Sequence, residues 1–334
     1  MGTLNLSNPK TELLIKDILK DGFGTISGVL NTEKSELLSA KCKEILLTDY
    51  EFSGVSQQSP KTGEVYNNAK TRHTAYKTDN RNLIGISQTV DNLIEDILTD
   101  EIVNSTLVSL LGKDYKIYTC AIRHASHLSS FVGLHQDGYA QFSMAVFLND
   151  VDAMSPTTVF YKKTHKLPFK FTDKFEAFDT KYFKNSLSPA IGKKGDILFF
   201  FNKTLHGMQS SLKKIDQSSV ILFAFHPSGF PYSPWRLPDK SRYSSSFISG
   251  LGPELRRLFE YNPDDYTNLD GELIIKNTSN NTSRPIDSLA MDQEYSGNYI
   301  TTIYWFVLYY IFFILRVFRK IFRLIQRLLV SISR

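Results

Sequence analysis

The sequence predicts a mainly β protein with flanking helices, a jelly-roll or cupin-like barrel, and a C-terminal hydrophobic membrane-anchor helix. Three observations support this fold class. Short runs rich in β-branched and aromatic residues recur between residues 115 and 225. Helical patterns dominate the segments before them, and an uncharged apolar run begins at residue 299. At 42% hydrophobic residues, the chain is able to bury one sizeable core.

The barrel strands are predicted from composition and from the turn residues that bound them. The run 197–201 is continuously apolar and follows Gly195-Asp196, which is typical of a buried strand. Several such strands separated by turns favour a jelly-roll or cupin-like barrel. The predicted strands are residues 115–123, 141–148, 157–161, 197–201 and 219–225.

Helices are predicted mainly before the barrel. Apolar spacing indicates a short helix at 13–19 and a longer one at 32–47, for which Thr32 is the expected N-cap. Two more helices, at 91–98 and 100–111, are expected to pack outside the barrel. The polar stretch 53–82 between them is expected to be a long loop.

A candidate metal site follows from two histidines and an aspartate. Residues two apart on a strand point to the same side, so His135 and Asp137 can reach one metal ion together. His206, 71 positions after His135, would complete the two-histidine, one-carboxylate set that holds non-haem Fe(II) and leaves coordination places open. The alternative is a surface pair and an unrelated histidine at a strand end.

Six segments carry a resemblance to a known family. In chain order they are Ile122-Arg-His124, Gly133-Leu-His-Gln-Asp-Gly138, Val146-Phe-Leu-Asn-Asp-Val151, Thr164-His-Lys166, Gly195-Asp196 and His206-Gly207. Together they resemble the phytanoyl-CoA dioxygenase-like (PhyH) family of Fe(II)- and 2-oxoglutarate-dependent oxygenases. The resemblance implies a double-stranded β-helix with an opening strand near Asp21-Gly-Phe23 and a short closing helix at 252–261.

The same resemblance implies a cofactor set and a reaction. His135, Asp137 and His206 would hold Fe(II), with 2-oxoglutarate and O₂ as co-substrates. Halogenating relatives have a small residue at the carboxylate position, so Asp137 favours hydroxylation of a small-molecule substrate. Tyr139 and Gln141 follow on alternate positions and are candidate substrate contacts, or else ordinary barrel lining.

The sequence departs from the family pattern at the co-substrate anchor. The family usually places an Arg about eleven residues beyond the second His, where its bidentate fork pairs with the distal carboxylate of 2-oxoglutarate. Gln217 stands at that position, and Lys213 and Lys214 are the nearest cations. Arg123 is a further candidate if it faces inward. The departure also admits a non-catalytic barrel, a membrane-tethered binding or scaffold module.

The C-terminal segment has the pattern of a membrane anchor. Residues 299–315 carry no charge, and as a helix these 17 residues span about 25 Å, just short of a hydrocarbon core of about 30 Å. Beyond them Arg316, Lys320, Arg323 and Arg327 recur at helical spacing, which is typical of a basic amphipathic helix on an anionic membrane surface. The tail therefore favours a lipid or lipid-linked substrate, or a location beside a membrane pathway.

Charge and cysteine content bound the remaining possibilities. Residues 299–334 hold six of the 39 Lys and Arg, which leaves 33 basic against 34 acidic residues elsewhere and argues against nucleic-acid binding. The two cysteines suit a reducing compartment, and the first residues lack a signal-peptide pattern. We expect an oxygenase domain at 1–265, a polar linker at 266–298 and an anchor at 299–334, membrane-associated with the barrel facing the cytoplasm.

Overall fold

A computed structural model of the chain describes its helices, strands and most of their connections. The described residues are 8–47, 56–58, 65–67, 71–73, 78–84, 87–113, 115–129, 131–136, 142–166, 186–212, 217–226, 250–259, 266–269 and 272–275. The predicted anchor at 299–334 lies outside them. Within the described part of the chain, no helix is both long and apolar enough to cross a membrane.

The chain begins with a helix that leads directly into the barrel. Helix α1, Pro9–Asp21, starts at Asn8, whose side chain accepts a hydrogen bond from the amide of Lys10, and it ends at Gly22 in the left-handed conformation with φ of 93°. Strand β1, Phe23–Ile26, follows at once and pairs antiparallel with β11. The predicted opening strand is therefore confirmed.

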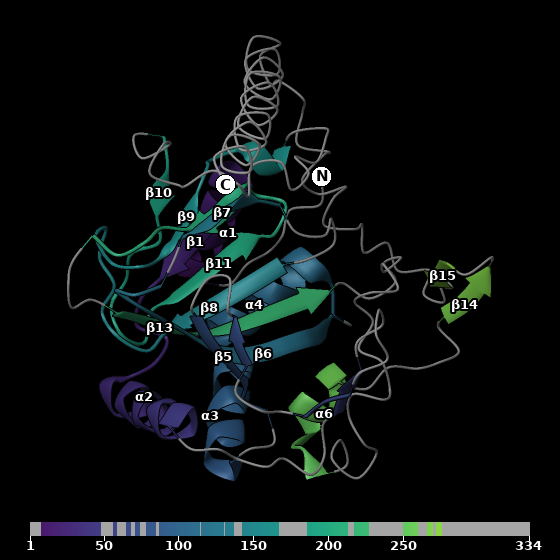
Figure 1. Ribbon diagram of the computed structural model, residues 1–334. Helices are drawn as coiled ribbons and strands as arrows, with labels where there is room; N and C mark the ends of the chain where they lie inside the picture. The colour runs from purple at the N-terminus through teal and green to yellow at the C-terminus, as the bar shows by residue number, and fades with distance from the viewer. Residues whose placement is uncertain are drawn as a thin grey trace, which may run out of the picture.

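Two sheets form the barrel (Figure 1). The larger has the order β1-β11-β8-β13-β6-β5-β4 and the smaller the order β10-β9-β12-β7. From β6 to β13 the chain passes back and forth between the two sheets, with β9 and β10 as consecutive strands of the smaller one, as in a jelly roll. The barrel strands are β6 Lys116–Ser126, β7 Val132–His135, β8 Phe142–Phe147, β9 Thr158–Phe160, β10 Ser188–Pro189, β11 Ile197–Phe201, β12 His206–Met208 and β13 Gln217–His226.

The larger sheet has two buried faces. Its outer face packs on the helices through residues such as Ile221 and Phe223 of β13. Its inner face looks toward the smaller sheet, where Ala145, Leu198 and Phe200 pack with Phe160 of β9. Because each face has its own apolar layer, β8 and β11 are buried along their whole length, as continuous apolar runs predict.

Three further helices cover the outer face. They are α2 Thr32–Leu47, α3 Gln88–Thr99 and α4 Glu101–Leu111, close to the predicted bounds. The expected N-cap of α2 was wrong by one position: Asn31, not Thr32, accepts a hydrogen bond from the amide of Lys34. Asp100 ends α3 and caps α4 with its carboxylate.

The stretch predicted as one long loop contains strands. β5, Thr78–Asn82, pairs with β6 and extends the larger sheet, and β4, Thr71–His73, pairs with β5 beyond it. A separate pair joins β2, Ser56–Gln58, to β3, Val65–Asn67. β4 is the edge of the larger sheet and β5 lies next to it; backbone hydrogen bonds hold such strands without an alternation of apolar residues, so the polar sequence concealed them.

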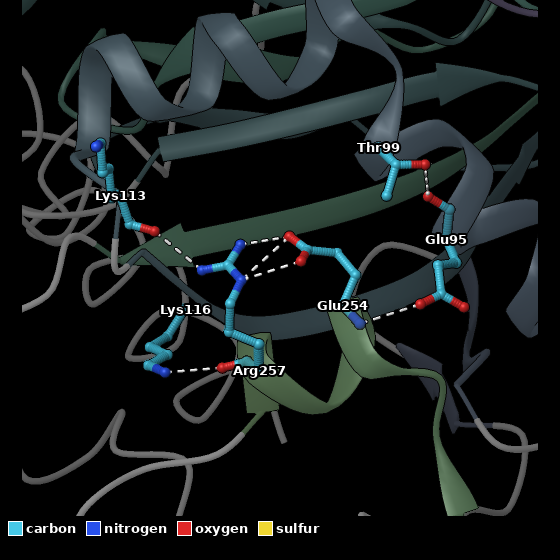
Figure 2. Close-up of polar contacts among 6 residues, drawn as sticks. All are labelled: Glu95, Thr99, Lys113, Lys116, Glu254 and Arg257. Atoms are coloured by element: carbon cyan, nitrogen blue, oxygen red, sulfur yellow. Dashed lines mark hydrogen bonds and ion pairs between the residues drawn. The ribbon is translucent and has the colours of Figure 1, made fainter.

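The predicted closing helix is confirmed and is held by polar contacts (Figure 2). Helix α6, Pro253–Phe259, starts where the Glu254 amide donates to the Glu95 carboxylate. The Arg257 guanidinium pairs with Glu254, donates to the backbone carbonyl of Lys113 and lies 5.2 Å from the centre of the Tyr115 ring. Beyond α6, β14 Tyr266–Leu269 and β15 Glu272–Ile275 form a hairpin at the start of the predicted linker.

Candidate metal centre

His135 and His206 lie side by side across the smaller sheet. His135 ends β7, His206 begins β12, and the two residues are direct partners in the antiparallel register. Their ring centroids are 4.4 Å apart with 49° between the ring planes. The structure thus brings together two of the three predicted metal ligands from positions far apart in the sequence.

Gly207 allows these two strands to approach closely. A Cβ atom at this position would lie 2.5 Å from the backbone oxygen of Val132 and 3.1 Å from that of Gly133. No side chain fits there without moving one strand away from the other. The His-Gly pair therefore combines a predicted metal ligand with the close backbone contact that places it.

Both imidazoles are held in the same way. The Nδ1 atom of His135 lies 2.8 Å from the carbonyl oxygen of Gly133, and Nδ1 of His206 lies 2.7 Å from that of Thr204. A carbonyl only accepts hydrogen bonds, so Nδ1 carries the proton in each ring. In the neutral imidazole this leaves the lone pair on Nε2, the form in which histidine binds a metal.

Aromatic side chains surround the second histidine. The His206 ring centroid lies 5.4 Å from that of Phe200 and 6.3 Å from that of Phe160, which itself stacks on Phe23 at 4.4 Å. Only 6% of the His206 surface is exposed. An apolar shell of this kind limits access of water and lowers the local dielectric around a metal centre.

Gln136, between the two ligands of the predicted triplet, has a structural task that sequence reasoning missed. Its side chain is 3% exposed and donates a hydrogen bond to the backbone carbonyl of Lys203. The neighbouring Asn202 accepts a hydrogen bond from Ser143 of β8. The alternation of side chains along an extended strand could have predicted this role, because Gln136 would then point to the side opposite His135 and Asp137.

His165 is a second buried histidine near this region, but its contacts are structural. Its Nε2 donates to the backbone oxygen of Leu19 at 3.1 Å, and its ring stacks on Phe201 at 5.3 Å. Burial lowers the pKa of His165 to about 4, so its ring stays neutral at physiological pH. His165 joins the 3₁₀ turn η1, Thr164–Lys166, to α1.

The remaining predicted site residues fall into two groups. Asp137, the expected third ligand, lies outside the described residues, as do Tyr139, Gln141, Lys213 and Lys214. Arg123 on β6 and Gln217 at the start of β13 are described, and both side chains are exposed. Among the described residues no group of three His, Cys, Asp or Glu could hold a metal ion.

The two histidines suit the metal that the resemblance implies. Paired imidazoles with Nε2 lone pairs are ligands for Fe(II) and for the neighbouring divalent transition metals. Asp137 follows His135 by two positions and supplies a carboxylate of the expected type. The donor set therefore fits non-haem iron by its chemistry.

Comparison with known proteins yields one family and several distant structures. A family model described as phytanoyl-CoA dioxygenase (PhyH) matches residues 18–210, more than half of the chain. No curated protein matches the sequence.

Among solved structures, this chain is similar to the non-heme alpha-ketoglutarate-dependent epimerase SnoN from nogalamycin biosynthesis, with 14% sequence identity and a TM-score of 0.49. The match covers 69% of this chain and 87% of the SnoN chain. AviO1 from Streptomyces viridochromogenes Tue57 has 13% identity and a TM-score of 0.47, with 67% and 98% covered. HygX from Streptomyces hygroscopicus, with nickel and 2-oxoglutarate bound, has 14% identity and a TM-score of 0.46, with 65% and 87% covered.

Proposed function

Because the chain belongs to the phytanoyl-CoA dioxygenase family, we propose that it is an Fe(II)- and 2-oxoglutarate-dependent dioxygenase that oxidises a small-molecule substrate. The observation that carries the proposal is the pairing of His135 with His206, both with Nδ1 bound to a backbone carbonyl. Asp137 is the third ligand in this proposal. An enzyme of this class needs those three groups on one side of the metal and open places opposite.

The protein's own contribution is to hold and shield the centre. Bound Fe(II) and 2-oxoglutarate supply the oxidation of a substrate bond by O₂. The carbonyls of Gly133 and Thr204 fix the orientation and tautomer of the two imidazoles. Phe160 and Phe200 exclude water from one side of His206, which protects a reactive centre from side reactions.

Hydroxylation is the reaction we propose within this class. The carboxylate at Asp137 supports it, since a halogenating site would need that coordination place for halide. Tyr139 and Gln141, on alternate positions after Asp137, are the proposed substrate contacts. Product analysis with ¹⁸O₂ tests the reaction type: hydroxylation leaves one labelled oxygen in the product. An unlabelled stereoisomer of the substrate would instead identify an epimerisation.

The location that we propose is a membrane surface. Residues 299–334 would bind the cytoplasmic leaflet through the apolar run and its basic continuation, with the barrel facing the cytoplasm and a lipid or lipid-linked substrate. Flotation of the full chain with vesicles that contain anionic lipids tests this. Protection of the barrel from protease in inverted membrane vesicles would contradict the cytoplasmic orientation.

A direct test of the metal and co-substrate uses the full-length protein under anaerobic conditions. Fe(II) and 2-oxoglutarate are titrated while the visible charge-transfer band of the chelated complex is recorded. The band is expected for the unmodified protein and lost in His135→Ala and His206→Ala. His127→Ala is the matched control, because His127 is exposed in the turn after β6.

Each outcome of this titration has a distinct meaning. Iron binding without the band would indicate another co-substrate. Absence of iron binding would favour the alternative function, a non-catalytic membrane-tethered barrel that serves as a binding or scaffold module.

A further inference from the structure

The inner face of the larger sheet contains a cation that the family pattern does not place there. Residues of β13 alternate between the faces: Ile221 and Phe223 belong to the outer layer, whereas Val220 and Leu222 pack on the inner one. The register with β6 continues without a shift from Gln217 to Ala224. Strand alternation therefore assigns every position at the start of β13 to one face.

Gln217 falls on the outer face. It shares the parity of Ser219, whose hydroxyl contacts His124, and of the core residue Ile221. Ser218, the next residue, is on the inner face and is 7% exposed. At the beginning of the last barrel strand, the residue that points toward the smaller sheet is therefore a serine, which has no charge to offer a carboxylate.

Arg123 is on the inner face of the adjacent strand. It pairs with Val220, while its neighbours on the same face, Ala121 and Ala125, pair with Leu222 and Ser218. Arg123 and Ser218 are thus diagonal neighbours, and such residues are about 7–8 Å apart, which is within reach of a long side chain. At the inner-face positions of β6, β8, β11 and β13 that the structure describes, the lysines and arginines are Arg123 and Lys116, and Lys116 lies at the far end of β6, where it donates to the backbone carbonyl of Arg257.

Arg123 also lies at a suitable depth below the histidines. A row of paired residues, Phe200, Ser143 and Ala224, crosses the sheet at the level of His206, whose ring lies 5.4 Å from that of Phe200. Val220, the partner of Arg123, is four residues from Ala224, or about 13 Å along the strand. An extended arginine and a five-carbon diacid bound at the metal together span such a gap.

Small side chains flank Arg123 along β6, and its cross-strand partners are Val220 of β13 and Asn80 of β5. Ala121 and Ala125 flank it along β6, and Ser218 adds a hydroxyl at the diagonal position. The side chain is exposed, so its charge is retained in water, and its planar fork binds a carboxylate through two parallel hydrogen bonds.

We propose that Arg123, supported by Ser218, binds the distal carboxylate of 2-oxoglutarate in place of the arginine that the family carries on the last barrel strand. This inference rests on the proposed function and makes it more specific. In this proposal the cation that binds the co-substrate lies on β6, next to the last barrel strand β13, and on the same face of the sheet. Gln217 has no part in co-substrate binding.

The test compares two keto acids on the full-length protein loaded anaerobically with Ni(II), which does not turn over. One is 2-oxoglutarate, and the other is 2-oxopentanoate, in which a methyl group replaces the distal carboxylate. Calorimetric titration of Arg123→Met should show an affinity for 2-oxoglutarate reduced about 10- to 100-fold, the value of a hydrogen-bonded charge pair. The affinity for 2-oxopentanoate should stay as in the unmodified protein.

Three further variants complete the design. Arg123→Lys keeps the charge without the fork and should lose part of the 2-oxoglutarate affinity, so it serves if Arg123→Met does not fold. Gln217→Met tests the rival position and should bind both keto acids normally. Lys10→Met removes one exposed positive charge from α1 and controls for net charge.

The outcomes separate this inference from the proposed function. An unchanged preference for 2-oxoglutarate in both Arg123 variants would overturn the inference and leave the function standing. Equal binding of the two keto acids by the unmodified protein would do the same, because the distal carboxylate would then go unrecognised. If the unmodified protein bound neither Ni(II) nor a keto acid, the proposed function itself would fail.

Discussion

The side-chain amide of Gln136 donates a hydrogen bond to the backbone carbonyl of Lys203, three residues before His206. This bond ties the segment between the first two proposed ligands to the turn that leads to the third. The bond therefore fixes the segment after His135 relative to the turn before His206, the two proposed ligands that the structure describes.

Gln136→Met should weaken metal binding. The variant keeps the side chain's length but leaves the buried Lys203 carbonyl without this donor, so we expect a loss of stability of about 1–3 kcal/mol. Loss of a residue that positions metal ligands lowers metal affinity about 10- to 100-fold. Competition with a metal-binding dye measures the affinity, and urea unfolding measures the stability.

A matched control for this variant is Gln209→Met. Gln209 also donates to backbone carbonyls, those of Ala153 and Ser155, and it lies just beyond β12, as many residues after His206 as Lys203 lies before it. It should lower stability and leave metal affinity unchanged. Equal effects of the two variants on metal affinity would show that Gln136 has no special positioning role.

Gly207→Ala should separate β7 from β12. The added methyl group would meet the backbone oxygen of Val132 at 2.5 Å, and backbone cannot move aside as a flexible side chain can. We expect a destabilisation of about 1–3 kcal/mol and a loss of metal affinity. Gly250→Ala is the control, since nothing lies within 4 Å of a Cβ there. Normal metal binding by Gly207→Ala would argue against close strand contact at the site.

His165 should make the protein sensitive to acid. Its pKa in the folded protein is about 4, below the ordinary value of 6.5, so the unfolded chain binds the proton more readily. The contribution of neutral His165 to the free energy of unfolding is thus fully present above pH 6.5. It is lost as the pH drops toward 4, which lowers the free energy of unfolding by up to roughly 3 kcal/mol. His165→Phe should show a flatter dependence of unfolding free energy on pH, with His127→Phe retaining the slope of the unmodified protein.

Arg257→Met should loosen the attachment of α6. The variant loses the pair with Glu254, the hydrogen bond to the Lys113 carbonyl and the contact over the Tyr115 ring. Because Arg257 is partly exposed, we expect a loss of only about 1–2 kcal/mol in thermal or urea unfolding. Lys41→Met, which removes an exposed pair with Glu44 at the same spacing, should cost less than about 0.5 kcal/mol. An equal cost for both would mean that the Arg257 contacts do not hold the helix.

The strands of the barrel could be predicted because their residues are selected by burial. β8, β11 and β13 are either continuously apolar or alternate between apolar and polar residues, and both patterns can be recognised in the sequence alone. β7 and β12 are too short to show a pattern, and only their histidines drew attention to them. β4 and β5 were missed because strands at and next to the edge of the sheet carry polar residues with no apolar pattern.

The closeness of the two histidines was predictable from the sequence, and their surroundings were less so. Spacing on a strand is enough to pair His135 with Asp137, and the structure brings His206 beside His135 as expected. The partner of Gln136 could not be predicted. Its hydrogen bond to the Lys203 carbonyl depends on the conformation of a turn, and no local sequence pattern indicates that conformation. The face occupied by Arg123 likewise required the register between β6 and β13.

The pairing of β1 with β11 has a consequence for the order of folding. Residues 23–26 leave the ribosome early, yet their partners, residues 197–201, are made after most of the barrel. The Gly22 carbonyl also accepts hydrogen bonds from the Phe201 amide and the Thr204 hydroxyl, next to His206. A nascent chain therefore keeps its first strand without a partner through most of synthesis. The contacts of Gly22 with Phe201 and Thr204 therefore form only after residues 197–204 have been made, late in the synthesis of the barrel.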